Sequence, residues 1–278
     1  MKGKRVVVTG ASRGIGRESA LAIAGMGADL VLVVRDAERG RAVADEIRKT
    51  GASAEVVVGD LSSIADVRRV AEDILRSHDR IDVLLNNAGA ILMDRITTKD
   101  GYEATFATNH LAYFLLTDLL LPALRRAPHA RVVNVASEAH KRGGMRWDDL
   151  MGERRYSGFF AYCQSKLANI LFTAELAKRL EGTNVTTNAV HPGAVASGFA
   201  LNNRGAIKML WRLASPFMLD SEEGAKTSIY VATDPSVEHV SGRYFDKCRE
   251  KAPSRAARDA DAAKRLWTIS EELVSRAR

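Results

Sequence analysis

Two side chains that could carry out proton transfer, Tyr162 and Lys166, lie in a segment with helical periodicity that begins near residue 159. A spacing of four residues places them on the same helix face, within side-chain reach. A free phenol has a pKa of about 10, which is poorly suited to proton transfer at neutral pH. Because a nearby ammonium group favours the phenolate, we expect Lys166 to lower the pKa of Tyr162. The spacing alone is common by chance and usually structural.

Two further polar residues stand where such chemistry needs support. Ser137 follows the apolar run 131–135, at the end of a predicted strand, and Asn109 lies inside a long helical segment. The alternatives are that Ser137 only bonds loop backbone and that Asn109 only caps or kinks its helix, since helix interiors rarely favour asparagine. The neighbouring His140 and Cys163 are interpreted as packing residues.

A glycine-rich loop follows the first apolar run directly, with Gly10, Gly14 and Gly16 in a GxxxGxG spacing. Glycines permit a tight turn and let backbone N–H groups approach an anion, while the start of the next helix adds partial positive charge. Tight strand-to-helix turns also use glycine. The position at the first strand–helix junction nevertheless favours a dinucleotide phosphate.

The end of the second apolar run indicates which dinucleotide. An enzyme that uses NAD needs an acidic side chain there, whereas one that uses NADP needs cations for the 2′-phosphate. The run ends Val34-Arg35, and Arg13 stands in the glycine loop, so both arginines are candidate phosphate ligands. Each arginine alone is as well explained as a solvated surface residue. Asp36 is expected to cap the next helix, and we predict NADP(H).

The segments that position these residues alternate between short apolar runs and longer amphipathic stretches. Apolar runs that are buried on both faces and separated by helices predict one α/β domain over 1–278, a Rossmann-type doubly wound parallel sheet with helices on both faces. The predicted strands are 5–9, 30–34, 54–58, 83–86, 131–135, 185–190 and 243–245. The predicted helices are 18–26, 37–49, 64–77, 101–126, 159–180 and a tail within 256–278.

Two segments interrupt this alternation. The loop 138–157 is long and contains Trp147, and 196–219 is apolar and only loosely helical. Long insertions at the carboxyl ends of parallel strands are where such sheets bind ligands, so 196–219 is predicted to be a substrate lid. Its stretch 209–218 is as well explained by an interface as by a substrate wall.

Composition excludes several other classes of protein. The net charge of +7 is dispersed among acidic residues along helices, so we expect no nucleic-acid partner. No run of eighteen apolar residues is present, which predicts no membrane span. The two separated cysteines indicate a reducing compartment and no thiolate metal site, so we expect a cytoplasmic protein.

Taken together, the motifs resemble the short-chain dehydrogenase/reductase superfamily in order and context. The matching motifs are TGASRGIG from Thr9, Asp60-Leu61, Asn86-Asn87-Ala88-Gly89, Asn109, Ser137, Tyr162-x-x-x-Lys166 and His191-Pro192-Gly193. Within that superfamily, the segments around Trp147, 155–169, Pro253 and Trp267 are similar to the retinol dehydrogenase and protochlorophyllide reductase branch.

The resemblance implies a catalytic set and a cofactor set. Tyr162 exchanges a proton with the substrate oxygen, Ser137 bonds that oxygen, Lys166 binds the nicotinamide ribose, and Asn109 holds a water linking Lys166 to solvent. The implied cofactor ligands are Gly10, Ser12, Arg13, Gly14, Ile15, Gly16, Arg35, Asp60, Leu61, Asn87, Ala88, Gly89, Tyr162, Lys166, Pro192, Gly193, Val195 and Ser197.

The implied activity is hydride transfer between NADP(H) and a small carbonyl or alcohol, of a lipophilic kind as in retinol dehydrogenases. A homo-oligomer is possible. The alternative is a non-catalytic dinucleotide-binding regulator, because a fold does not fix a function. The presence of Asn109, Ser137, Tyr162 and Lys166 together argues against a mere sensor, which needs no tuned phenol.

Overall fold

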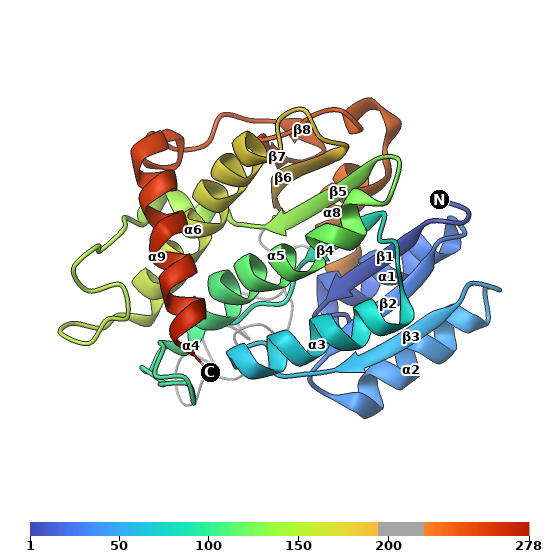
Figure 1. Ribbon diagram of the computed structural model, residues 1–278, viewed down its shortest axis with the longest axis horizontal. Coiled ribbons are helices and arrows are strands. Elements are labelled where there is room, and N and C mark those ends of the chain that lie inside the picture. The colour runs from blue at the N-terminus through green and yellow to red at the C-terminus, as the bar shows by residue number, and fades with distance from the viewer. Residues whose placement is uncertain (194–219, 278) are drawn as a thin grey trace.

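The β-branched runs form one eight-stranded sheet in the computed structural model, which describes residues 1–193 and 220–277 (Figure 1). The strand order is β3-β2-β1-β4-β5-β6-β7-β8; neighbours from β3 to β7 are parallel, and β8 is antiparallel to β7. The strands are β1 (Arg5–Thr9), β2 (Asp29–Val34), β3 (Ala54–Val58), β4 (Val83–Asn86), β5 (Ala130–Val135), β6 (Val185–His191), β7 (Tyr244–Asp246) and β8 (Arg249–Glu250).

Helices cover both faces of the sheet (Figure 1). The longer helices are α1 (Gly14–Gly25), α2 (Ala37–Arg48), α3 (Ile64–Ser77), α5 (Ala112–Arg125), α6 (Gly158–Arg179), α8 (Ser221–Thr233) and α9 (Ala260–Arg276). Because side chains of a strand alternate between its faces, Val7 of β1 packs in a cluster with α3, α5, α6 and α9. Val6 and Val8 pack in a second cluster with α1, α2 and α8. The predicted doubly wound fold is confirmed.

Local sequence explains where most helices begin. The side chains of Asp36, Ser63 and Ser157 accept hydrogen bonds from backbone N–H groups at the starts of α2, α3 and α6. Asp36 therefore has the capping role that the sequence predicts. Helix α1 differs from these three, because Arg13 occupies its N-cap position and makes no side-chain capping bond.

The predicted helix over 101–126 is divided in the structure. A short helix α4 (Ala104–Phe106) leads into a π-helical turn η1 (Ala107–Leu111) and then into α5. The predicted C-terminal helix is present as α9, after a 3₁₀ turn η6 (Ala256–Arg258). Helix α8 and strand β8 were not predicted. The predicted lid, 196–219, lies outside the described residues, as do Val195 and Ser197. Within 1–193 and 220–277, no helix is long and apolar enough to cross a membrane.

Candidate active site

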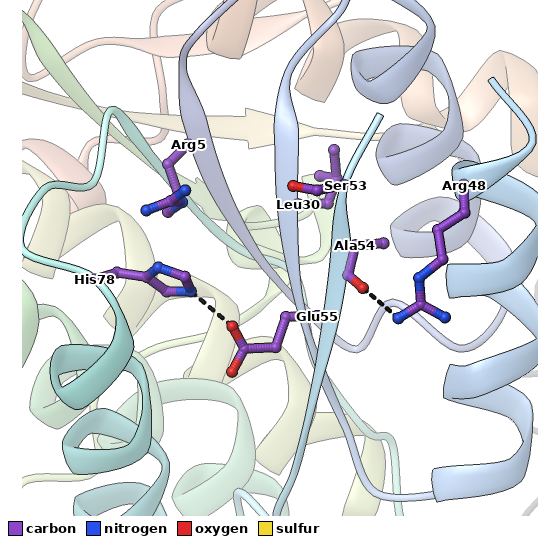
Figure 2. A pocket seen from close by; sticks show the side chains of 7 residues that line it. All are labelled: Arg5, Leu30, Arg48, Ser53, Ala54, Glu55 and His78. Atoms are coloured by element: carbon purple, nitrogen blue, oxygen red, sulfur yellow. Dashed lines mark hydrogen bonds and ion pairs between the residues drawn. The ribbon is translucent and has the colours of Figure 1, made fainter. Parts of the chain in front are cut away.

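The candidate residues gather at the carboxyl edge of the sheet, because parallel strands all end there. The glycine loop follows β1, Arg35 follows β2, Asn87 follows β4, Ser137 follows β5, and Pro192 follows β6. The opposite edge has a hollow of about 330 Å³, at the amino ends of β1, β2 and β3 (Figure 2). Several of its polar side chains already bond one another or the backbone: Nε2 of His78 pairs with Glu55, and Arg48 bonds the carbonyl oxygen of Ala54. We therefore place the active site at the carboxyl edge.

The glycine loop is shaped to let a ligand approach its backbone. Gly10 has a φ of 68° and Gly14 a φ of 57°, both in the left-handed region that favours glycine. A Cβ atom at Gly16 would lie 2.4 Å from the carbonyl oxygen of Gly10, so only glycine fits. The turn opens into the uncapped start of α1, which leaves N–H groups for an anion. Ser12 and Ile15 are half-buried in the same loop. The loop fits a pyrophosphate.

Strand β4 holds this loop in place through Thr9, a residue that the sequence analysis did not select. The Thr9 hydroxyl accepts from the backbone N–H groups of Asn87 and Ala88, at 2.9 and 3.0 Å. The side-chain amide of Asn87 donates to the carbonyl oxygen of Thr9 at 2.8 Å. Here Asn87 shapes the loop, in addition to the contact with the cofactor that the resemblance implies. A threonine directly before the first glycine was the available signal.

Three arginines, one more than predicted, surround the end of β2. The charges of Arg39 and Arg35 both lower the pKa of Arg13, after burial, which has the largest effect. Asp36 acts in the opposite direction and pairs with Arg39, with Nε and Oδ2 3.1 Å apart. Cations held this close repel one another, so an anionic group among them is favoured. Sequence reasoning missed Arg39 because it lies a helical turn beyond the strand end.

The remaining cofactor candidates lie along the same edge. The Asp60 carboxylate accepts from the backbone N–H and hydroxyl of Ser62, at 3.0 and 2.9 Å, and Leu61 is buried. Pro192 and Gly193 are half-buried after β6, and Gly89 is half-buried after β4. These residues all follow strands that end at the carboxyl edge of the sheet, and their contacts with a cofactor stay a prediction.

Helix α6 carries the predicted pair. The side chain of Lys166 is 2% exposed, and its Nζ atom lies 5.7 Å from the centre of the Tyr162 ring. Nζ donates to the carbonyl oxygen of Val135 at 2.9 Å. Burial lowers the pKa of Lys166 to about 7. The ammonium group is therefore beside the tyrosine but bonded to the end of β5.

The pKa of Tyr162 differs from the sequence expectation. Burial raises it to about 12, and a side-chain hydrogen bond with Ser137 lowers it by a smaller amount. The expected lowering by Lys166 is not seen, because burial favours the uncharged form of both groups and the ammonium group faces Val135. The phenol thus keeps its proton at neutral pH.

Asn109 lies in the π-helical turn and is fully buried. Its side-chain oxygen accepts from the N–H of Ala90 at 2.7 Å, and its amide donates to the carbonyl oxygen of Ala90 and to the Ser165 hydroxyl, both at 2.9 Å. The helix is irregular at this asparagine, as in the alternative interpretation of its sequence, and such π turns are frequent at functional sites. Its side chain links the loop that follows β4 to Ser165 of α6, next to Lys166.

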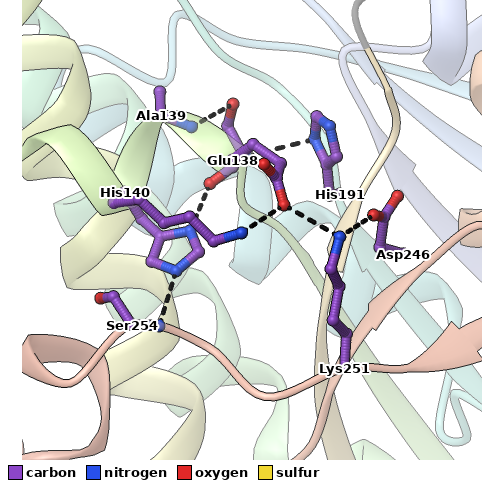
Figure 3. Close-up of polar contacts among 9 residues, drawn as sticks. Glu138, Ala139, His140, His191, Asp246, Lys251 and Ser254 are labelled. Carbon is purple, nitrogen blue, oxygen red and sulfur yellow. Dashed lines mark hydrogen bonds and ion pairs between the residues drawn. The ribbon is translucent and has the colours of Figure 1, made fainter.

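A polar frame that the sequence analysis missed surrounds the residue after Ser137 (Figure 3). The Glu138 carboxylate pairs with Lys141 at 2.7 Å and with Lys251 at 3.2 Å, and Lys251 also pairs with Asp246 at 2.7 Å. These cations lower the pKa of Glu138 to about 2. The Glu138 N–H donates to Nδ1 of His191 at 3.3 Å. The frame thus links the end of β5 to β6, β7 and the segment after β8.

Comparison with known proteins gives a consistent result. A family model described as short chain dehydrogenase matches residues 4–208. Retinol dehydrogenase 12 from Homo sapiens is 46% identical over 276 residues, which cover 99% of this chain and 87% of the relative. Retinol dehydrogenase 14 from Homo sapiens is 42% identical over 292 residues, which cover 99% of this chain and 87% of the relative.

Solved structures share the fold. An uncharacterized protein from Mycobacterium paratuberculosis superposes with a TM-score of 0.80 at 34% identity, over 99% of this chain and 94% of that one. A short chain dehydrogenase from Burkholderia cenocepacia, in complex with NADP, has a TM-score of 0.71 at 27% identity, over 88% of this chain and 96% of that one.

Proposed function

Because the chain belongs to the short-chain dehydrogenase family and is an NAD(P)-dependent oxidoreductase, we propose that it interconverts a lipophilic carbonyl and its alcohol with NADP(H), using Tyr162 for proton transfer. The surroundings of Tyr162 carry its assignment. Its phenol keeps a proton and bonds Ser137. It lies one helical turn from the buried Lys166, at the edge of the sheet that also holds the glycine loop.

The chain's own residues account for the acid–base part of the reaction. In the reduction direction, Tyr162 donates its proton to the substrate oxygen while the Ser137 hydroxyl donates a hydrogen bond to the charge that develops there. In the oxidation direction, Tyr162 takes the proton back. Lys166 faces the cofactor ribose in this proposal, and Asn109 fixes the turn beside it. The bound cofactor supplies or accepts the hydride.

NADP(H) is proposed over NAD(H) from the charge at the end of β2. Arg13, Arg35 and Arg39 place cations there, and the carboxylate of Asp36 is occupied by the N–H of Arg39 and by its guanidinium. The relative crystallised with NADP supports the same choice. The glycine loop, Asp60, Leu61 and 87–89 hold the adenosine and pyrophosphate in this proposal, and Pro192, Gly193, Val195 and Ser197 hold the nicotinamide.

Lipophilic substrates are proposed from the names of the relatives, which act on retinol. We propose that 196–219 closes over such a substrate. The cytoplasmic location and the possible homo-oligomer stay predictions. A non-catalytic regulator is not favoured, because the proton-transfer residues and their buried surroundings are all present.

The test is loss of NADPH absorbance with a panel of aldehydes that includes retinal and short polar aldehydes. We expect turnover with NADPH, faster for long apolar aldehydes, and binding without turnover in Tyr162→Phe. Cofactor binding without turnover of any member by the wild-type protein would favour the regulator instead.

A further inference from the structure

His140 is fully buried, three residues after Ser137 of the candidate site. The backbone N–H of Ser254 donates to its Nε2 atom at 3.1 Å (Figure 3). Its Nδ1 atom lies 2.7 Å from the carbonyl oxygen of Ser137. Because a backbone N–H can only donate and a carbonyl oxygen can only accept, these partners fix the tautomer. The ring is neutral, with its hydrogen on Nδ1.

The ring of His140 helps to hold Ser137 in place. The Ser137 carbonyl oxygen accepts both from Nδ1 and from the backbone N–H of His140, at 2.7 and 3.1 Å. The Ser137 hydroxyl oxygen accepts from the N–H of Ala139 at 3.2 Å, so its own hydrogen is left to point elsewhere. Ser137 is thus anchored at both oxygen atoms, and its hydroxyl is held for the bond with Tyr162.

The ring of His140 is itself held in place by its surroundings. It packs edge-on against Tyr244 of β7, with centroids 5.2 Å apart, and burial lowers the pKa of His140. A protonated ring would place an N–H against the N–H of Ser254, which is unfavourable without a partner. The segment around Ser254, which lies 114 residues after His140 in the chain, therefore supports Ser137 through the neutral side chain of His140.

We propose that His140 is a positioning residue: as the Nδ1–H tautomer, it bonds the carbonyl oxygen of Ser137 and so sets the hydroxyl that meets Tyr162 and the substrate oxygen, while the bond from Ser254 stabilises the ring. This inference rests on the proposed function. It predicts that the bond from His140 to Ser137 matters for turnover, whereas the bond from Ser254 matters for stability.

Two isosteric variants separate these bonds. In His140→Asn the amide nitrogen replaces Nδ1, so the bond to Ser137 is kept and the acceptor for Ser254 is lost. In His140→Gln the amide oxygen replaces Nε2, so the acceptor is kept and the donor to Ser137 is lost. We expect both to lower the melting temperature, kcat to be about tenfold lower in His140→Gln than in His140→Asn, and the Kd for NADPH to be unchanged in both.

His129→Gln, an exposed histidine just before β5, serves as the control and should leave kcat unchanged. Equal kcat values in the Asn and Gln variants, in a wild-type protein that turns over aldehydes, would overturn the positioning role alone. No turnover by the wild-type protein would overturn the proposed function instead. If His140→Gln does not fold, ring-nitrogen NMR of the wild-type protein decides: a neutral Nδ1–H ring is expected, and an Nε2–H ring or an imidazolium at neutral pH overturns the inference.

Discussion

The Nζ atom of Lys166 lies 5.7 Å from the centre of the Tyr162 ring and donates to the carbonyl oxygen of Val135, so the two groups are neighbours without being an ion pair. Burial favours the uncharged form of each. The phenol of Tyr162 therefore keeps its proton at neutral pH.

Tyr162→Phe should reduce kcat by about a hundred- to ten-thousandfold, because the ring stays and only the transferable proton is lost. The Kd for NADPH should stay within the error of the wild-type value in fluorescence titrations. Tyr230→Phe on α8, whose hydroxyl bonds Ser236, provides the matched control and should keep its kcat. Near-wild-type turnover in Tyr162→Phe would contradict the mechanism.

Lys166→Met should change how stability depends on pH. Since the folded pKa of Lys166 is about 7 and the ordinary value is 10.5, the unfolded chain binds a proton that the folded chain lacks between these values. The free energy of unfolding of the wild-type protein should thus rise with pH over this window, by at most about 1.4 kcal/mol per pH unit from this group. Urea denaturation from neutral pH upward should show a flatter profile in Lys166→Met; an identical slope would contradict the buried lysine. The variant should also lose cofactor affinity and rate.

Arg35→Ala should weaken NADPH binding by about ten- to a hundredfold, because a charge-assisted hydrogen bond to the 2′-phosphate is lost. Binding of NADH should hardly change, because NADH lacks that phosphate. Arg41→Ala, which removes an exposed arginine on the following helix α2, is the control. Calorimetric titration with both cofactors measures the effect, and parallel shifts for NADPH and NADH would show that the assignment is wrong.

Gly16→Ala should lower stability by about 1–3 kcal/mol and abolish tight cofactor binding, because its Cβ atom would meet the Gly10 carbonyl oxygen at 2.4 Å. Gly25→Ala in the same helix has nothing within 4 Å of its added Cβ atom and should cost nothing. Thermal melts with and without NADPH compare the two. If NADPH still raises the melting temperature of Gly16→Ala as much as that of the wild type, the glycine loop does not bind the cofactor as proposed.

Much of the fold could be predicted because short β-branched runs and helical periods are local signals. The bounds of β1, β3, β4 and α3 match the prediction. Helix α8 was missed because its Gly224 and its several serine and threonine residues weaken the helical pattern, and it forms by packing against α1. Strand β8 is too short for any period to show.

The candidate site was predictable where one motif fixes the geometry, as for Tyr162 and Lys166 on one helix face. It was not predictable where partners come from distant segments. Neither the bond from Lys166 to Val135 nor the tie from His140 to Ser254 has a sequence signal, because each forms only when the strands are assembled. The raised pKa of Tyr162 likewise depends on burial, which the spacing does not report.

The strand order has a consequence for how the chain folds. The central strand β1 lies between β2 and β4, and the backbone N–H of Arg5 bonds Asp82, 77 residues later. No parallel pair can close locally, so loop-closure entropy opposes early assembly, and folding on the millisecond-to-second scale is expected. During synthesis, the edge of β1 that pairs with β4 stays unpaired until β4 has been made. That interval is when association with other chains competes with folding, and a bound dinucleotide cannot help until the carboxyl edge exists.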